Sequence, residues 1–333
     1  MNASARPRIL LSASCREQLR APIQQALGGE AVELVALEAI AADASQQVDA
    51  AFISRDITGL SSKSVASDAL RDCHAVLRRS AHLAWVHTHS AGADRPIYAE
   101  LRTRGVIVST SSGANAQIVA HSALAGLLAL ARRLPDLLTA QARREWAPLA
   151  VGPLPRDLAG QTAVLVGWGP IARCLQPLLA ALGLQTIVVR RSTAPAAPGI
   201  ETLGFEQLRD VLPRADWLVL ACPLTPQTRA LIGAPELRLL PPDANLINVA
   251  RGEIVVQDAL VEALRSGQLA GAFLDVFEHE PLPPASPLWA LPRVIVTPHS
   301  AGHSDGNAAR VAEIFVANLR RWRRGEALLN AVP

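Results

Sequence analysis

Three short segments in the second half of the chain carry the side chains best suited to chemistry. Each follows a stretch that the sequence pattern predicts to be a strand, and they contain Arg251, Glu280 and His299. Parallel α/β sheets place ligands at the carboxyl ends of their strands. An arginine, a carboxylate and an imidazole that converge at such an edge would suit a site for a keto acid.

A glycine-containing turn lies earlier in the chain, between a predicted strand and a predicted helix. Gly167 would permit a tight turn, and Gly169 would let the backbone approach a pyrophosphate. Ala172 takes the third position of the pattern, where a small residue lets helix and strand pack closely. The helix opens with Pro170 and Ile171, and its N-terminus would face the phosphates, although a proline lacks one N–H donor. The turn therefore predicts a dinucleotide site.

The next predicted strand ends in Arg190, Arg191 and Ser192, with no acidic residue beside them. In an NAD site an Asp or Glu near this point binds the ribose hydroxyls. Two guanidinium groups and a hydroxyl suit a 2′-phosphate instead. The sequence therefore predicts a preference for NADP, and NAD is retained as an alternative cofactor. The competing interpretation is a solvated arginine pair in a loop.

The elements that must position these residues form two α/β series. In the first, strand-like stretches alternate with helical ones at residues 8–11, 50–53, 84–87 and 106–109. Such alternation favours a parallel sheet. The second series has six strand candidates, at residues 163–166, 186–189, 217–220, 246–249, 271–274 and 294–297. Six strands in this order fit a dinucleotide-binding domain.

Two long helices are predicted beside these series. Residues 115–133 are apolar nearly all round, and a helix of that kind is usually buried between domains or between subunits. Near the end of the chain Val311, Phe315 and Leu319 recur at helical spacing. Gly325 is well placed to end that helix. Periodicity alone does not decide to which domain the last helix belongs.

Length and composition narrow the class of protein. A chain of 333 residues predicts two domains, and 50% hydrophobic with 18% charged residues predicts substantial buried cores. The net charge of +3 with mixed signs gives no reason to expect nucleic acid as a partner. No apolar run reaches the ~20 residues of a membrane span, so no membrane partner is expected. Four separated cysteines and the lack of a convincing signal peptide predict a cytoplasmic protein with reduced thiols.

Taken in order along the chain, the motifs resemble the D-isomer-specific 2-hydroxyacid dehydrogenase family. The matching pieces are Ser90-Ala-Gly-Ala-Asp94, the glycine turn, Cys222-Pro-Leu-Thr-Pro-Gln-Thr228 and the three C-terminal segments. The resemblance implies two Rossmann-like domains with parallel sheets. A dinucleotide-binding domain of residues 109–298 would be inserted into a split substrate domain of residues 1–108 and 299–333. It also implies a homodimer, whose interface would include the helix at residues 115–133.

The same resemblance implies a role for each site residue. His299 would be the acid/base that protonates the ketone oxygen, and Glu280 would keep its imidazolium charged over a wider pH range. Arg251 would bind the substrate carboxylate and polarise the carbonyl. The backbone N–H groups of a loop in the first domain would help to hold that carboxylate, at Ser90, Ala91 and Gly92. The implied cofactor contacts are Asp275, near the nicotinamide amide, and the backbone of Cys222, Pro223, Val249 and Ala250.

The expected substrate is a small 2-keto or 2-hydroxy acid, because Ser286-Pro-Leu-Trp289 and the arginine pair are similar to the glyoxylate and hydroxypyruvate reductases. Two alternatives stay open. Formate-type hydride transfer needs no proton shuttle, and that branch carries Gln where Glu280 stands. A nucleotide-sensing protein on the same fold would bind NADPH without turnover. The chain departs from the family pattern at Ala221, where a His is frequent, and at His121, where an acid is common.

Two further groups of residues are assigned no site. The histidines at 82, 87, 89 and 121 have no acid or cysteine at ligand spacing beside them, so no metal is expected. His89 precedes the Ser90 loop, and a substrate contact is the preferred interpretation there. The basic run Arg320-Arg-Trp-Arg-Arg324 is interpreted as the solvated end of an amphipathic helix rather than a phosphate-binding surface.

Overall fold

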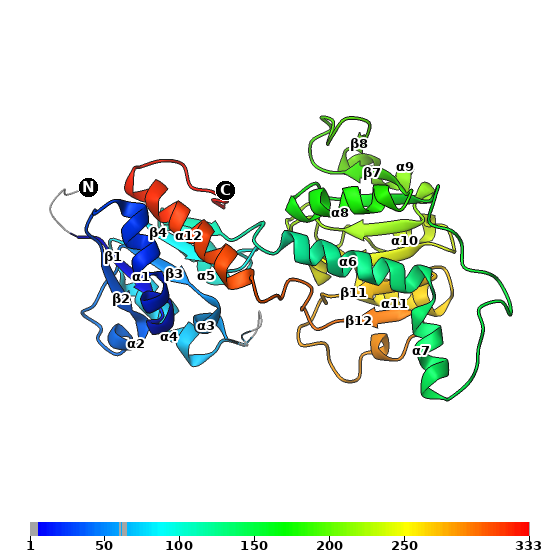
Figure 1. The fold of residues 1–333 in the computed structure, drawn as a ribbon, viewed down its shortest axis with the longest axis horizontal. Helices are drawn as coiled ribbons and strands as arrows, with labels where there is room; N and C mark the ends of the chain where they lie inside the picture. Colours follow the sequence, from blue (N-terminus) through cyan, green and yellow to red (C-terminus); the bar gives the residue numbers. More distant parts are fainter. Residues whose placement is uncertain (1–5, 60, 62–64, 333) are drawn as a thin grey trace. The chain divides into compact units, whose positions relative to one another are not determined.

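The computed structural model describes residues 6–59, 61 and 65–332, and the chain divides into two units (Figure 1). Unit 1 takes the chain up to Asn115 and resumes at Ser304, whereas unit 2 is Ala116–His303. Each unit is built on a sheet of parallel strands with helices between them, so the predicted fold class is confirmed. The sequence placed the two domain boundaries after residues 108 and 298, several residues before the boundaries of the two units. His299 therefore lies in unit 2.

The sheet of unit 1 has the strand order β2-β1-β3-β4-β5, and every neighbouring pair is parallel. Its strands are β1 (Arg8–Leu11), β2 (Glu33–Ala36), β3 (Ala50–Ile53), β4 (Trp85–Thr88) and β5 (Ile107–Thr110). The sequence predicted four of these strands and missed β2. That strand lies at the edge of the sheet and buries only its last two residues, so its hydrophobic pattern is weak.

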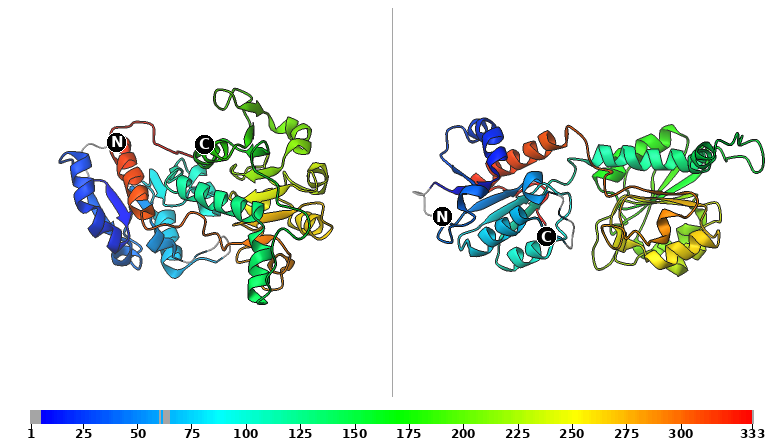
Figure 2. Two further views of the ribbon diagram at one scale, coloured as in Figure 1. Left: turned by 45° about the vertical axis from the view of Figure 1, so that its right-hand side comes forward. Right: turned by 90° about the horizontal axis from the view of Figure 1, so that it is seen from below.

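Helices cover both faces of this sheet, and one of them comes from the end of the chain (Figures 1 and 2). Ile9 and Leu11 face α1 and α12, while Leu10 faces the opposite core, as the two-residue period of a strand requires. Phe315 of α12 stacks on Phe52 of β3, with ring centroids 4.5 Å apart. The last helix therefore belongs to unit 1. The helices of unit 1 are α1 (Ala13–Leu27), α2 (Leu37–Ile40), α3 (Arg55–Thr58), α4 (Asp68–Arg79), α5 (Pro96–Thr103) and α12 (Asn307–Arg323).

The sheet of unit 2 has the order β12-β11-β10-β9-β6-β7-β8 and is also parallel throughout. Its strands are β6 (Thr162–Val166), β7 (Gln185–Val189), β8 (Glu201–Leu203), β9 (Trp217–Leu220), β10 (Asn245–Asn248), β11 (Gly271–Leu274) and β12 (Val294–Val296). The sequence missed only β8, a three-residue edge strand with no buried residue. The strand order reverses between β6 and β9, which is where such sheets bind dinucleotides.

The helix predicted at residues 115–133 is α6 (Ala116–Ala131), and it packs on the sheet of unit 2 beside α8 (Pro170–Ala181). A Cβ at Gly126 would lie only 2.3 Å from Cγ of Phe273, so glycine is required for this close packing. No single helix in the described chain is long and apolar enough to span a membrane. Only α6 and α7 together pass that test, as a pair bent by 70°. The other α-helices of unit 2 are α7 (Leu134–Ala142), α9 (Leu208–Val211), α10 (Ala234–Leu239) and α11 (Gln257–Arg265).

Candidate active site

The ends of three neighbouring strands bring the expected side chains to one edge of unit 2. Because β10, β11 and β12 are parallel neighbours, the segments that follow them start side by side. Arg251 follows β10, Asp275 directly follows β11, and His299 follows β12. The convergence that the sequence predicted is therefore present, although Glu280 reaches the edge from a loop five residues beyond Asp275.

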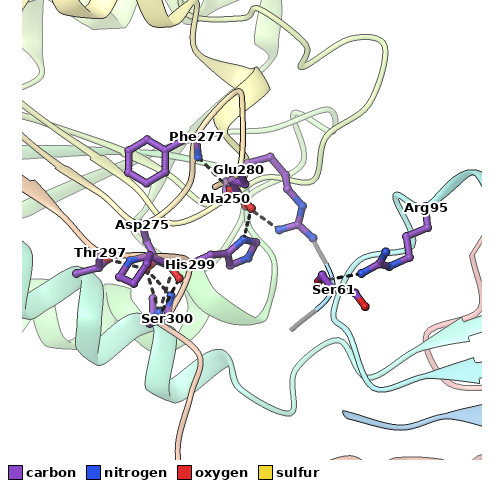
Figure 3. A network of polar contacts seen from close by, with 12 residues as sticks. Ser61, Arg95, Ala250, Asp275, Phe277, Glu280, Thr297, His299 and Ser300 are labelled. Atoms are coloured by element: carbon purple, nitrogen blue, oxygen red, sulfur yellow. Dashed lines mark hydrogen bonds and ion pairs between the residues drawn. The ribbon is translucent and has the colours of Figure 1, made fainter. Parts of the chain in front are cut away.

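Glu280 and His299 form a direct pair (Figure 3). Nδ1 of His299 lies 2.8 Å from Oε2 of Glu280, and the other carboxylate oxygen accepts a hydrogen bond from the N–H of Phe277 at 3.1 Å. The Glu280 side chain is 14% exposed, whereas that of His299 is 48% exposed. A carboxylate only accepts hydrogen bonds, so Nδ1 carries the proton and Nε2 is left to exchange one with a substrate.

His299 stands in a loop with an unusual backbone conformation. Its φ is 52°, in the left-handed region that is unfavourable for a residue with a Cβ. The buried carboxylate of Asp275 accepts hydrogen bonds from the hydroxyl of Thr297 and from the N–H groups of Ser300 and Ala301 (Figure 3). The backbone carbonyl of Asp275 accepts a hydrogen bond from the N–H of His299 at 2.8 Å. Sequence reasoning missed these contacts, because they join residues from two strands.

Arg251 is positioned by the side chain of Asn248, which is 1% exposed. Oδ1 of Asn248 accepts a hydrogen bond from the N–H of Ala250, and Nδ2 donates one to the backbone carbonyl of Arg251, each at 3.1 Å. The guanidinium donates to the carbonyl of Ala250 at 2.7 Å and is half-buried. A Cβ at Gly252 would lie 1.8 Å from the carbonyl carbon of Phe277, so only glycine lets the chain continue from Arg251 here.

The glycine turn has the shape that a pyrophosphate needs. Gly167 has φ 105°, and a Cβ there would lie 2.8 Å from the backbone of Ala221 and Cys222. Gly169 caps α8, and a Cβ there would meet nothing within 4 Å. Ala172 is fully buried against the sheet. Pro170 occupies the first turn of α8 and offers no N–H, so donors to a phosphate at this turn would have to come from its neighbours. This cradle fits a dinucleotide.

The predicted cofactor-lining backbone lies beside this cradle. Val249 and Ala250 are buried after β10, and Cys222 is buried after β9. Burial raises the pKa of the Cys222 thiol to about 12, so the thiol stays neutral. The hydroxyl of Thr228 donates to the carbonyl of Pro223 at 2.7 Å and accepts a hydrogen bond from the N–H of Thr225 at 2.8 Å. This turn fixes the backbone at Cys222 and Pro223.

The arginine pair lies at the carboxyl end of β7. Nη2 of Arg190 donates to the carbonyl of Ala194 at 2.6 Å, and its N–H donates to Leu203 of β8. Arg191 and Ser192 are exposed. The nearest acid along the chain, Glu201, accepts hydrogen bonds from Nη1 and Nη2 of Arg214, and this contact lowers the pKa of the Glu201 carboxyl. The carboxylate of Glu201 is therefore engaged by another residue.

The remaining predicted residues lie in unit 1. Ser90, Ala91 and Gly92 follow β4, where the carbonyl of Ser90 accepts the N–H of Ser111. His89 contacts the hydroxyl of Thr58 at 3.1 Å. His87, two residues earlier on β4, is fully buried. In the described part of the chain no group of three metal-ligating side chains is found.

Comparison with known proteins agrees with this geometry. The family model described as "D-isomer specific 2-hydroxyacid dehydrogenase, NAD binding domain" matches residues 124–301. The chain belongs to this family. It is 32% identical over 290 residues to a glyoxylate reductase of Korarchaeum cryptofilum, covering 81% of this chain and 86% of that protein. A glyoxylate reductase of Thermococcus litoralis is 34% identical over 265 residues, covering 77% and 79% of the two chains.

Solved structures of this dehydrogenase family share the fold over the whole chain. A D-isomer-specific 2-hydroxyacid dehydrogenase from Xanthobacter autotrophicus Py2 with NADPH and MES has a TM-score of 0.77 and 30% identity, covering 99% of this chain and 98% of that one. An NADPH-dependent glyoxylate/hydroxypyruvate reductase from Sinorhizobium meliloti with NADP and malonate has a TM-score of 0.75 and 28% identity, covering 98% and 97%. The resemblance found from the motifs is confirmed, and the dehydrogenase is an oxidoreductase that works with a nicotinamide cofactor.

Proposed function

We propose that this dehydrogenase reduces a small 2-keto acid, of the glyoxylate or hydroxypyruvate type, with NADPH as its preferred reductant. The observation that carries the proposal is the Glu280–His299 pair at the strand edge that also carries Arg251. The glyoxylate reductases among its relatives support the substrate class. Formate-type transfer is disfavoured because Glu280 and His299 form a complete proton shuttle.

The chain's own residues account for binding and proton transfer. Arg251 binds the substrate carboxylate and draws charge toward the carbonyl oxygen with its planar donors. The bound nicotinamide supplies the hydride that reaches the 2-carbon. His299 gives the proton on Nε2 to the oxygen, so the ketone becomes a hydroxyl and the imidazole becomes neutral. Glu280 stabilises the imidazolium before transfer and keeps the proton on Nδ1 afterwards. The prediction that backbone N–H groups at Ser90, Ala91 and Gly92 also bind the substrate carboxylate remains untested.

The preference for NADP rests on the end of β7. Arg191 and Ser192 are exposed there, Arg190 stands beside them, and the carboxylate of Glu201 is engaged by Arg214. An exposed guanidinium and hydroxyl without a competing acid suit a 2′-phosphate. The relatives from Xanthobacter and Sinorhizobium were solved with NADPH and NADP, respectively. Gly167, Gly169 and the N-terminus of α8 would hold the pyrophosphate.

The direct test is oxidation of NADPH by the purified protein with glyoxylate, hydroxypyruvate, pyruvate and phenylpyruvate, each repeated with NADH. We expect turnover with NADPH and the smaller acids, and a lower kcat/KM with NADH. Equal use of NADH would contradict the role of the arginine pair. NADPH binding without turnover of any acid would overturn the enzymatic proposal and favour a nucleotide-sensing protein.

A further inference from the structure

We propose that Arg173, in the first turns of α8, is a further binding residue for the 2′-phosphate of NADPH. The inference rests on the proposed function, because it adds a residue to the cofactor site named there. Arg173 is the only charged residue of α8. Its side chain is exposed and has no hydrogen-bond or ion-pair partner in the described part of the chain.

The charge of Arg173 is unfavourable at its position in the helix. A helix N-terminus carries a partial positive charge, which repels a cation and attracts an anion. Arg173 is the fourth residue of α8, and its N–H donates to the carbonyl of the N-cap residue, Gly169, at 3.1 Å. Helical side chains lean toward the N-terminus, so the guanidinium is directed at the first turn. That turn contains no acidic residue. An anionic ligand there would offset the repulsion.

Arg173 lies on the side of α8 that faces away from α6. The helix packs beside α6 and also contacts β7 (Figure 1). Successive residues of a right-handed helix are about 100° apart. Ala172 is fully buried against the sheet, and Ile171 before it is partly buried in the apolar cluster that α6 and α8 share. Arg173 after it therefore falls on the opposite flank, on the side of β7.

This flank of α8 adjoins the end of β7. Because β6 and β7 are parallel neighbours, α8, which follows β6, begins at the same edge as the residues that follow β7. Those residues include Arg190 and Arg191. The connection from β7 to β8 also approaches the helix, since Ala196 and Ile200 pack against the cluster shared by α6 and α8. The placement brings Arg173 to the same edge as the arginine pair.

Arg190 gives a second indication that an acceptor belongs at this edge. Its Nη2 donates to the carbonyl of Ala194, but its Nε is buried and has no hydrogen-bond partner in the part of the chain that the structure describes. A buried donor without an acceptor costs free energy. A phosphate offers several acceptor oxygens, and planar guanidinium groups bind such groups well. The pyrophosphate is expected elsewhere, at the glycine turn and in line with the helix axis.

The test measures cofactor binding without substrate in Arg173→Gln, with Arg265→Gln as the control. Arg265 is also an exposed helical arginine, in the last turn of α11. We expect the Kd for NADPH to rise about 10-fold in Arg173→Gln, the effect of one lost hydrogen bond to a charged group, and the Kd for NADH to stay within about twofold. The affinity for 2′,5′-ADP, which lacks the pyrophosphate, should fall by the same factor as that for NADPH. Arg265→Gln should alter none of these values.

Two further measurements distinguish a shared phosphate site from a structural effect. Combined with Arg191→Ala, Arg173→Gln should weaken NADPH binding by less than the product of the two single effects, since both guanidinium groups bind one phosphate. The Tm of the free protein should be unchanged or higher in Arg173→Gln, because the variant removes a cation from the positive end of a helix. A structural arginine predicts a lower Tm.

Equal losses of affinity for NADPH and NADH would overturn the inference and assign Arg173 to the pyrophosphate. Unchanged affinity for both cofactors, or single effects that simply multiply in the double variant, would also overturn it. None of these measurements needs a keto acid. If the wild-type protein binds NADPH but reduces none of the acids, the proposed enzymatic activity fails, yet the role of Arg173 is still decided.

Discussion

At the scale of single residues, the charge on Glu280 is what the proposed proton transfer depends on. Reduction uses protonated His299, and a carboxylate 2.8 Å from Nδ1 favours the charged imidazolium. Glu280→Gln keeps an oxygen for the N–H of Phe277 but removes that charge. We expect the limb of kcat that falls with rising pH to move to lower pH, because the neutral amide leaves the charged imidazole without its counter-charge. The measurement is kcat for keto-acid reduction across pH, with NADPH binding as a check.

Glu278→Gln is the control for this prediction, because it removes an exposed carboxylate two residues away. That variant should keep the wild-type profile. An unchanged profile in Glu280→Gln would mean that the pair seen in the structure does not govern protonation during turnover.

The two arginines at the end of β7 are expected to have different roles in cofactor binding. Arg190 already holds the carbonyl of Ala194, whereas the Arg191 side chain is exposed. Arg191→Ala should therefore raise the KM for NADPH by about 10-fold and leave that for NADH nearly unchanged, since only NADPH carries the 2′-phosphate. Steady-state kinetics with both cofactors measure this change. Arg238→Ala, which changes an exposed arginine on α10, is the control and should alter neither KM. If Arg191→Ala raised the KM for NADPH and for NADH equally, Arg191 would have a structural role instead.

At the scale of the elements, the sequence predicted strands wherever a strand is buried on both faces. Ten strands were found because runs such as Ile9–Leu11 or Leu218–Leu220 are continuously apolar. The edge strands β2 and β8 were missed because each begins with a glutamate that interrupts the apolar pattern. The edge strand β12 is equally short and has no fully buried residue, but its sequence Val-Ile-Val is an apolar run.

Within the site, the sequence predicted the residues that lie in local motifs, such as Arg251, Glu280 and His299. The hydrogen bonds of Asp275 were not predicted, because its partners follow another strand and are brought to it by the strand order. The hydrogen bonds of Asn248 are local, to Ala250 and Arg251, but no sequence pattern marks them.

The pairing of β4 with β5 produces a buried histidine with a testable effect on stability. His87 lies between the hydroxyls of Ser109 and Ser111, at 2.8 Å and 3.0 Å, and its ring packs beside that of Phe52 in a tilted arrangement. Burial, with a smaller contribution from His89, lowers the pKa of His87 to about 3. The unfolded chain binds this proton below pH ~6.5 and the folded chain does not. The stabilisation is therefore complete above that pH and is lost as the pH falls toward 3.

The consequence is a pH-dependent free energy of unfolding. His87→Gln should reduce the slope between pH 6 and 4 by up to about 1.4 kcal/mol per pH unit, apart from any constant loss through weaker packing. Chemical denaturation followed by circular dichroism at several pH values gives that slope. His82→Gln removes an exposed histidine and should leave the slope as in the wild type. Parallel slopes for all three proteins would show that His87 is not buried as a neutral base.

At the scale of the whole molecule, the expected homodimer and its interface at α6 stay predictions, and the structure offers a second candidate surface for that interface. The sequence placed α6 there because it is apolar, yet α6 buries its residues Val119, Ala123 and Leu127 within unit 2. Several exposed apolar side chains lie on α7 and on the segment after it, which runs away from the sheet of unit 2 (Figure 1). They are Leu134, Leu138, Trp146, Val151 and Leu154.

A second copy of the chain is the occupant we expect for this surface. Trp146 is 96% exposed and Leu138 is 61% exposed, which is a large apolar area for water to contact. A twofold pair of identical apolar patches covers itself, as in most homo-oligomers. Trp146→Ser combined with Leu138→Gln should convert a dimer to a monomer in size-exclusion chromatography with light scattering. Leu239→Gln, a less exposed leucine on α10, should leave the dimer intact. A monomeric wild-type protein, or a dimer that withstands the double change, would exclude this surface as the interface.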